Sequence, residues 1–131
     1  MKMSKMPTES PEYAEEDKKL EPFLNKVILG DVLEEMKKIP SGVVDMAFAD
    51  PPFNLRKDYG NYEDSKQDEE YLQWCFKWIN EMIRVLKPNG TLLLHNIPKW
   101  LIEYGAHLRK QGMIFRHWIA WDAMSTPLGK T

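Results

Sequence analysis

The chain has 131 residues, enough for one domain with a hydrophobic core but too few for two large domains. Hydrophobic residues make up 43% and charged residues 29%, the balance of an ordinary soluble globular protein. The formal net charge of -2 gives no basic footprint of the kind that many nucleic-acid-binding proteins show. No apolar run approaches the roughly 18 residues that a membrane span needs, and no signal peptide is recognisable. With Cys75 as its single cysteine the chain cannot form an internal disulfide, so we expect a cytoplasmic protein without a membrane partner.

The beginning of the chain is polar and rich in lysine, glutamate, serine and proline. It holds too few apolar residues to pack, so we expect residues 1–21 to form a disordered or loosely attached tail. The folded part is then one domain over residues 22–131.

This domain is expected to begin with a strand and a short helix. Residues 25–31 form a short apolar run that ends in Gly30-Asp31, which predicts a strand. Residues 32–39 carry apolar side chains at spacings of three and four, which predicts a helix, and Pro40-Ser41-Gly42 ends it.

A second strand is predicted over residues 43–49, where an apolar, β-branched run stops abruptly at Asp50-Pro51-Pro52-Phe53. The order strand, helix, strand favours parallel pairing with a right-handed connection. Because proline cannot continue a sheet ladder and restricts the residue before it, the four residues predict a stiff loop at the carboxyl end of this strand. Open α/β sheets bind their ligands at such ends.

Helices and strands continue to alternate after this loop. Residues 56–70 show no period and predict a polar loop. The later predicted elements are a helix over residues 71–86, a turn over 88–90, a strand over 91–95, a helix over 99–110 that Pro98 opens and Gly112 closes, and a strand over 115–121. This alternation predicts an α/β domain with a mainly parallel sheet. Because no helix is predicted after the last strand, we expect the domain to be incomplete.

The Asp-Pro-Pro-Phe loop has a structural and a functional interpretation. In the structural one, Asp50 caps a helix or turn and Phe53 packs into the core. The functional one makes the loop a binding site, and the polar Asn54 and basic Arg56 and Lys57 that follow a buried strand favour it.

In its context, this loop closely resembles the catalytic motif of DNA amino-methyltransferases, which carry Asp, Asn or Ser before Pro-Pro and an aromatic residue. Gly30-Asp31 upstream, Arg84-Val85-Leu86-Lys87-Pro88-Asn89-Gly90 after the tryptophan-rich helix, and Ile119-Ala120-Trp121 resemble further family motifs in the same order. The resemblance covers residues 25–128 and implies part of a Rossmann-like methyltransferase domain. Asp122 stands where family members often have lysine, which leaves the contacts of that loop open.

The resemblance implies methyl transfer from S-adenosylmethionine to the amino group of adenine, which we favour, or cytosine in DNA. This nitrogen is a poor nucleophile because its lone pair is delocalised into the ring. The Asp50 carboxylate and the Pro51 carbonyl would accept its two N–H bonds and localise the lone pair, while Pro51 and Pro52 fix the carbonyl direction. Because a duplex buries the group, the base must be flipped out, and Phe53 would stack on it. The chemistry requires no metal.

The remaining site candidates follow from the same resemblance. Gly30 and Asp31, with Asp50 nearby, would contact the cofactor, although Asp31 as the N-cap of the following helix is an equal alternative. Asn54, Arg56 and Lys57 would meet DNA, against the alternative of a turn and a solvated loop pair. The three histidines show no metal-ligand spacing, and we interpret them as structural.

One family feature is missing from the sequence. No Gly-x-Gly pair is present to wrap the methionine end of the cofactor. We therefore expect the chain to resemble the N-terminal half of a site-specific DNA methyltransferase of a restriction-modification system. On this interpretation it is inactive alone and pairs with the missing C-terminal half, a complementary subunit or a second copy of itself. The alternatives are a non-catalytic methyltransferase-like subunit beside an active partner, and an RNA or protein-amide methyltransferase.

Overall fold

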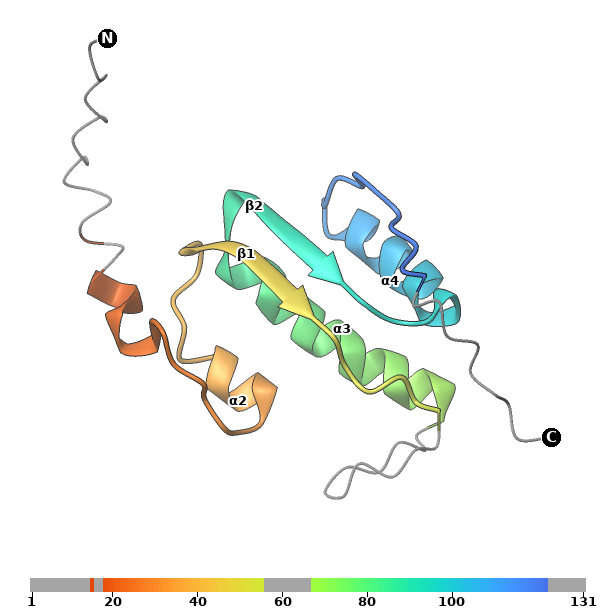
Figure 1. The fold of residues 1–131 in the computed structure, drawn as a ribbon, viewed down its shortest axis with the longest axis horizontal. Helices are drawn as coiled ribbons and strands as arrows, with labels where there is room; N and C mark the ends of the chain where they lie inside the picture. The colour runs from red at the N-terminus through yellow and green to blue at the C-terminus, as the bar shows by residue number, and fades with distance from the viewer. Residues whose placement is uncertain (1–14, 16–17, 56–66, 123–131) are drawn as a thin grey trace, which may run out of the picture.

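The computed structural model describes residues 15, 18–55 and 67–122 (Figure 1). Its elements are, in chain order, the 3-10 helix η1 over Glu21–Phe23, the helix α2 over Val32–Met36, the strand β1 over Val44–Ala49, the helix α3 over Asp68–Val85, the strand β2 over Leu86–Leu94 and the helix α4 over Pro98–Lys110. Nearly all of the expected tail over residues 1–21 and the loop residues 56–66 lie outside the described part.

The strands β1 and β2 form a parallel two-stranded sheet, and α3 connects them. Parallel neighbours cannot be joined by a tight turn, so a crossover of this kind is required. The aligned pairs run from Met46 with Thr91 to Ala49 with Leu94. The carboxyl ends of both strands therefore lie side by side, as their arrowheads show (Figure 1).

The turn predicted over residues 88–90 lies inside β2, as an irregularity of the ladder. Val44 pairs with Leu86, but the next aligned residue, Met46, pairs with Thr91. A Cβ atom on Gly90 would lie 3.0 Å from the Lys87 carbonyl oxygen and 3.2 Å from that of Asp45. Glycine therefore allows the backbones of the two strands to approach closely at this point.

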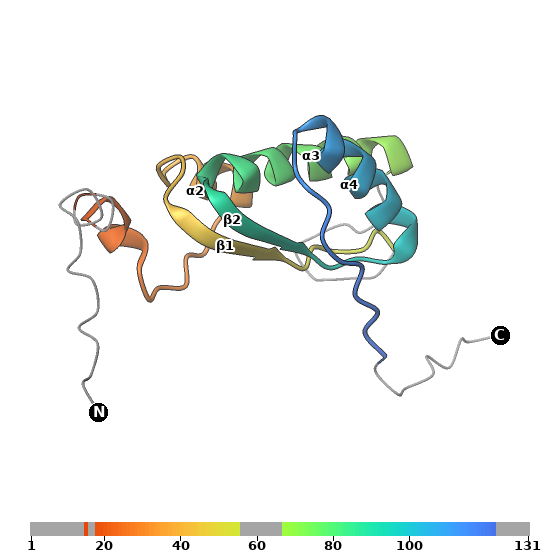
Figure 2. The same ribbon diagram turned by 90° about the horizontal axis from the view of Figure 1, so that it is seen from above.

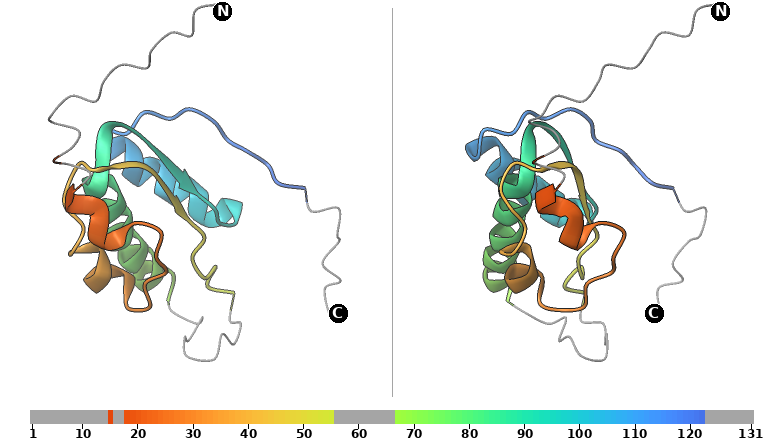
Figure 3. Two further views of the ribbon diagram at one scale, coloured as in Figure 1. Left: turned by 60° about the vertical axis from the view of Figure 1, so that its left-hand side comes forward. Right: turned by 90° about the vertical axis from the view of Figure 1, so that its left-hand side faces the viewer.

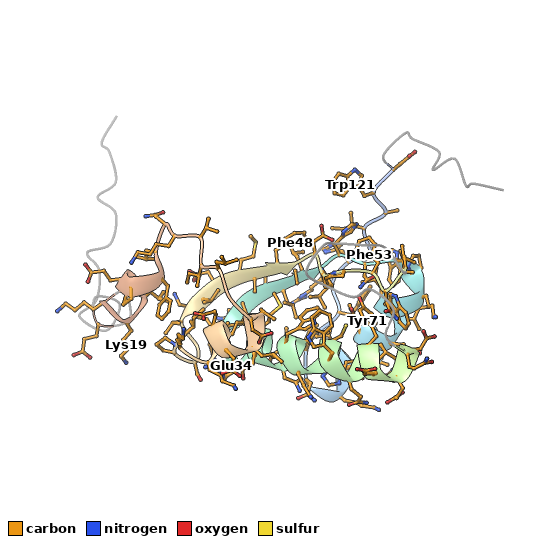
Figure 4. All side chains as sticks on the ribbon, turned by 90° about the horizontal axis from the view of Figure 1, so that it is seen from below. Lys19, Glu34, Phe48, Phe53, Tyr71 and Trp121 are labelled. Carbon is orange, nitrogen blue, oxygen red and sulfur yellow. The ribbon has the colours of Figure 1, made fainter. Side chains whose placement is uncertain are left out.

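The core fills the space between the sheet and the two long helices, which cover the same face of the sheet (Figure 2). Its buried residues are Tyr71, Cys75, Trp78, Ile79 and Met82 from α3 and Trp100 and Tyr104 from α4. Alternate residues of the strands pack against them, whereas Met46 and Phe48 are 58% and 59% exposed. Figure 4 shows Phe48 on the side of the sheet away from α3. Within the described residues, the sheet thus buries one face only.

The helices α3 and α4 match their predictions. The helix predicted over residues 71–86 is α3, which already begins at Asp68 because three acidic residues occupy its first turn, where the helix dipole favours negative charge. The helix predicted over residues 99–110 is α4, with Pro98 as its first residue. Gly112 has a φ of +80°, its N–H donates to the Arg109 carbonyl at 3.1 Å, and the Met113 N–H donates to the Leu108 carbonyl at 3.0 Å. This is a Schellman motif, and it confirms Gly112 as the C-terminal stop.

The short helix α2 is held to α3 by one arginine. The Arg84 guanidinium donates to the Met36 carbonyl at 2.8 Å and to the Ile39 carbonyl at 2.9 Å, and it pairs with Glu81 at 2.8 Å. The Met36 carbonyl belongs to the last residue of α2 and the Ile39 carbonyl follows shortly after, in the region where a helix leaves acceptors without intrahelical donors. Arg84 belongs to the segment over residues 84–90 that resembles a family motif, and in this chain it has a structural role.

Two predicted strands are not formed. Residues 25–31 are irregular, with Val27 and Leu29 fully exposed, and residues 115–121 are irregular as well, with Ile119 and Trp121 76% and 79% exposed. Figure 3 draws both segments as coil. An apolar, extended run becomes a strand only where a neighbouring backbone offers its donors and acceptors. Within the described residues only β1 and β2 pair, so the first strand-helix-strand unit was predicted wrongly, and the parallel unit is β1, α3 and β2.

The described residues include no helix that is long and apolar enough to cross a membrane.

Replacing Arg84 by leucine is expected to lower the free energy of unfolding by about 2–3 kcal/mol, because two carbonyls lose a charged donor and Glu81 loses its partner. Urea unfolding followed by circular dichroism measures this. The control is Lys37→Leu, which breaks an exposed pair with Glu34 and should change the free energy of unfolding much less than Arg84→Leu does. Equal effects of the two substitutions would contradict the conclusion that Arg84 holds α2 to α3.

Candidate active site

The candidate site lies at the adjoining carboxyl ends of β1 and β2. Asp50 directly follows β1, and His95 directly follows β2. Because Ala49 is aligned with Leu94, the next residues of the two chains come together, and the His95 N–H donates to the Ala49 carbonyl at 2.9 Å. Nδ1 of His95 lies 2.8 Å from Oδ1 of Asp50. The sheet register therefore places an imidazole beside the predicted catalytic carboxylate.

Aromatic rings surround this pair. The ring centroid of Phe53 lies 5.3 Å from that of His95, edge to face, and the ring centroid of Trp121 lies 5.8 Å from that of His95. Figure 4 labels Phe53 near the end of the sheet and Trp121 on the irregular segment that follows α4. The side chain of Asp50 is 56% exposed and that of His95 37%, so both can be reached from solvent.

The loop that carries Asp50 is held by buried hydrogen-bond donors on the helices α3 and α4. The Tyr71 hydroxyl, from the first turns of α3, donates to the Pro52 carbonyl, and Nε1 of Trp100, from α4, donates to the Phe53 carbonyl at 2.8 Å. Figure 4 shows Tyr71 in the layer between the sheet and α3. Two successive carbonyls of the loop thus point into the protein, and the loop is positioned by both long helices.

A buried amide sets the direction of these hydrogen bonds. Asn96 is 6% exposed, and its Nδ2 group donates to the hydroxyl oxygens of Tyr71 and Tyr104, both at 3.0 Å. Its Oδ1 atom accepts from the Ile97 N–H at 2.8 Å. Each hydroxyl oxygen accepts one hydrogen bond from Asn96, and each O–H group donates one. Tyr71 donates to the Pro52 carbonyl, and Tyr104 donates to the Cys75 sulfur at 3.0 Å. Every member of this cluster (Tyr71, Cys75, Asn96 and Tyr104) is satisfied.

Burial keeps the cluster protonated. Desolvation raises the pKa of the Tyr71 and Tyr104 hydroxyls above the usual value of 10.0, and it raises the pKa of the Cys75 thiol as well. Tyr71 therefore remains a donor to the Pro52 carbonyl at neutral pH. The buried thiol is an acceptor in this cluster and has none of the surroundings that activate a nucleophilic cysteine.

Gly30 and Asp31 lie at the N-terminus of α2. Oδ1 of Asp31 accepts from the N–H groups of Leu33 at 3.0 Å and Glu34 at 3.2 Å, so the N-cap role is present. A Cβ atom on Gly30 would lie 2.7 Å from the side chain of Glu35, which explains why glycine fits here. Among the described contacts none joins Gly30 or Asp31 to Asp50, and their cofactor role stays a prediction.

The predicted DNA-contacting residues are covered only in part. Asn54 has a φ of +56°, a left-handed conformation that asparagine tolerates better than most residues, and it turns the chain after Phe53. Arg56 and Lys57 lie outside the described residues. The part of the chain that the structure describes has no group of three or more His, Cys, Asp or Glu side chains able to hold a metal.

Sequence reasoning missed four residues of this site. His95 was interpreted as structural, although a mainly parallel sheet puts the carboxyl ends of its strands, and so Asp50 and His95, at the same end. Tyr71 and Trp100 were recognised only as apolar members of helices, because nothing in a helical period shows where a hydroxyl or an indole N–H points. Asn96 between a strand and a helix gave no signal beyond its polarity.

The cluster predicts how stability changes at alkaline pH. The folded pKa values of Tyr71 and Tyr104 are raised, so above about pH 10 the unfolded chain releases these two protons and the folded chain keeps them. The free energy of unfolding should therefore fall with rising pH, by up to about 1.4 kcal/mol per pH unit for each hydroxyl. Urea unfolding at a series of pH values measures the slope, and the double variant Tyr71→Phe, Tyr104→Phe should lose most of it. An unchanged slope would refute the burial of these hydroxyls.

Comparison with known proteins identifies a protein family and three relatives to which this chain is similar. A family profile described as "DNA methylase" (N6/N4 type) matches residues 44–131. The chain is 47% identical over 100 residues to the type II methyltransferase M.BamHI of Bacillus amyloliquefaciens, covering 76% of this chain and 23% of the relative. It is 34% identical over 108 residues to M.HpaI of Haemophilus parainfluenzae, covering 81% and 34%, and 40% identical over 70 residues to the DNA adenine methyltransferase YhdJ of Escherichia coli, covering 53% and 24%.

The chain thus spans a quarter to a third of the length of these curated relatives. No solved structure matches it significantly.

Proposed function

Because the chain belongs to the N6/N4 family of DNA methylases, we propose that it provides the base-methylating part of an enzyme that acts on the exocyclic amino group of a base in DNA. The enzyme would be site-specific and of the restriction-modification type, as the names of the type II relatives suggest. Because its substrate would be cellular DNA, it would act in the cytoplasm. Residues 22–131 would form the N-terminal part, with the catalytic motif, of a larger Rossmann-like methyltransferase domain.

The observation that carries this proposal is the orientation of the Asp-Pro-Pro-Phe loop. The carbonyls of Pro52 and Phe53 are engaged by Tyr71 and Trp100 inside the protein. The acceptors that the loop offers to a substrate are then the carboxylate of Asp50, which is more than half exposed, and the carbonyl of Pro51.

These two acceptors suit an amino group that must become a nucleophile. Each would accept one N–H of the target nitrogen, so that its lone pair leaves the ring system and points at the methyl donor. Acceptors that are already oriented favour the developing positive charge on nitrogen without reorganising. No covalent intermediate with the protein is needed.

The aromatic rim would receive the flipped base. Phe53, held at its carbonyl by Trp100, would present its ring to the base, and stacking of this kind contributes about 1–3 kcal/mol per base. We favour adenine over cytosine as the target because one relative is named a DNA adenine methyltransferase. Asn54, Arg56 and Lys57, which follow the loop, would contact the DNA strand.

S-adenosylmethionine would supply a methyl group on a positively charged sulfur. Asp31 is an exposed carboxylate and uses Oδ1 for the α2 cap, so its other oxygen is the atom suited to an adenosine N–H or O–H. Gly30 and Asp50 are the other candidate cofactor residues. These residues fit the group chemically.

Asp50→Ala should lower methyl transfer by at least about 100-fold, because one of the two acceptors for the target nitrogen is removed. The measurement is incorporation of tritiated methyl groups from S-adenosylmethionine into unmethylated duplex DNA. It should use the chain alone, where we expect negligible turnover, and the chain joined to the part of M.BamHI that it does not match.

The matched control is Asp45→Ala, which removes an exposed carboxylate of β1 that pairs with Lys87 at 3.0 Å. It should leave transfer within about threefold of the unchanged chain. An Asp50→Ala protein as active as Asp45→Ala would rule out the assignment of Asp50. Binding of duplex DNA should be retained in both variants.

A further inference from the structure

We infer that His95 is a positioning residue for Asp50: its imidazole donates from Nδ1 to Oδ1 of the carboxylate and thereby orients the carboxylate towards the target amino group. This inference rests on the proposed role of Asp50. It assigns a functional role to His95, which was interpreted from the sequence as structural. The residue that follows β2 would then take part in positioning the reacting groups.

The first support is that His95 is held in place independently of Asp50. Its N–H donates to the Ala49 carbonyl at 2.9 Å and extends the ladder of the sheet by one residue. Its ring also contacts those of Phe53 and Trp121, with centroid distances of 5.3 Å and 5.8 Å. The donor is therefore fixed by backbone pairing and ring contacts before it meets the carboxylate.

The second support is that the carboxylate needs an orienting partner. The Asp50 side chain is 56% exposed, and an exposed aspartate samples several rotamers. A charge-assisted hydrogen bond at 2.8 Å selects one of them. Within the described residues Oδ2 of Asp50 takes part in no hydrogen bond, so that oxygen remains for an N–H of the substrate.

The contact also defines which nitrogen of the ring carries a proton. An ionised carboxylate can only accept, so the Nδ1 atom that faces it must be the N–H. Neutral His95 is then held as the Nδ1–H tautomer, and the bond persists whether the ring is neutral or charged. A histidine that merely packed against Phe53 would have no reason to prefer this tautomer.

The tautomer can be measured without any activity. Long-range nitrogen–proton correlation spectra of the ¹⁵N-labelled 131-residue chain, recorded near pH 8.5, distinguish Nδ1–H from Nε2–H in a neutral imidazole ring. We expect His95 as Nδ1–H in the unchanged chain and a shift towards Nε2–H in Asp50→Ala. His107, whose Nε2 lies 2.7 Å from Asn80, serves as the internal control and should be the same in both. An Nε2–H tautomer of His95 in the unchanged chain would overturn the inference.

Kinetics with two matched substitutions complete the test. In His95→Asn the side-chain Nδ2 takes approximately the place of the imidazole Nδ1, whereas His95→Leu fills the same space without a donor. In the methyl-transfer assay, kcat of His95→Leu should fall about tenfold or more and KM for DNA should change less than about threefold, since orientation of a reacting group acts mainly on kcat. His95→Asn should restore most of kcat.

The outcomes separate this inference from the proposed function. Equal kcat values for His95→Leu and the unchanged protein would overturn the positioning role and leave the function of Asp50 intact. Equal losses in the leucine and asparagine variants would assign His95 to packing. If the chain joined to the complementary part of M.BamHI transfers no methyl group to DNA, the proposed function fails, and the tautomer of His95 alone decides whether it orients Asp50.

Discussion

The hydrogen bond from the Tyr71 hydroxyl to the Pro52 carbonyl is the contact on which the candidate site depends. A loop with two successive prolines lacks two N–H donors, so its carbonyls cannot be satisfied within the loop. Buried donors on α3 and α4 take their place. Asn96 donates to the Tyr71 hydroxyl oxygen and so directs the Tyr71 proton towards the loop. The packing of both helices against the sheet and the orientation of the loop therefore depend on the same residues, which build the core and also position the proposed catalytic acceptors.

The parallel register supplies the second part of the site. Pairing of Ala49 with Leu94 brings the residues after β1 and β2 together, which places His95 at Asp50. A shift of one residue would turn the side chains of one strand to the other face of the sheet. The irregularity at residues 87–90, where Gly90 lets the two backbones approach, lies upstream of this pairing. The ends of the strands consequently keep the aligned ladder that the site requires.

The helices and the loop could be predicted from the sequence because their causes are local. The stripe of apolar residues predicted α3, Pro98 and Gly112 bounded α4, and two prolines after an apolar run predicted the stiff loop at Asp50. The strands over residues 25–31 and 115–121 were predicted wrongly, since an apolar extended run says nothing about whether a partner strand is present. The orientation of the Tyr71 hydroxyl and the pairing of His95 with Asp50 depend on tertiary contacts between segments far apart in the chain, which no local pattern contains.

The most direct test of this account compares Tyr71→Phe with Tyr104→Phe in the methyl-transfer assay, with stability measured in parallel. Both substitutions remove one hydroxyl from the same buried cluster, but only Tyr71 donates to the loop. We expect Tyr71→Phe to lower kcat by about tenfold or more and Tyr104→Phe to keep it within about threefold. Equal kcat values for the two variants at equal stability would contradict the claim that buried donors from the helices orient the loop.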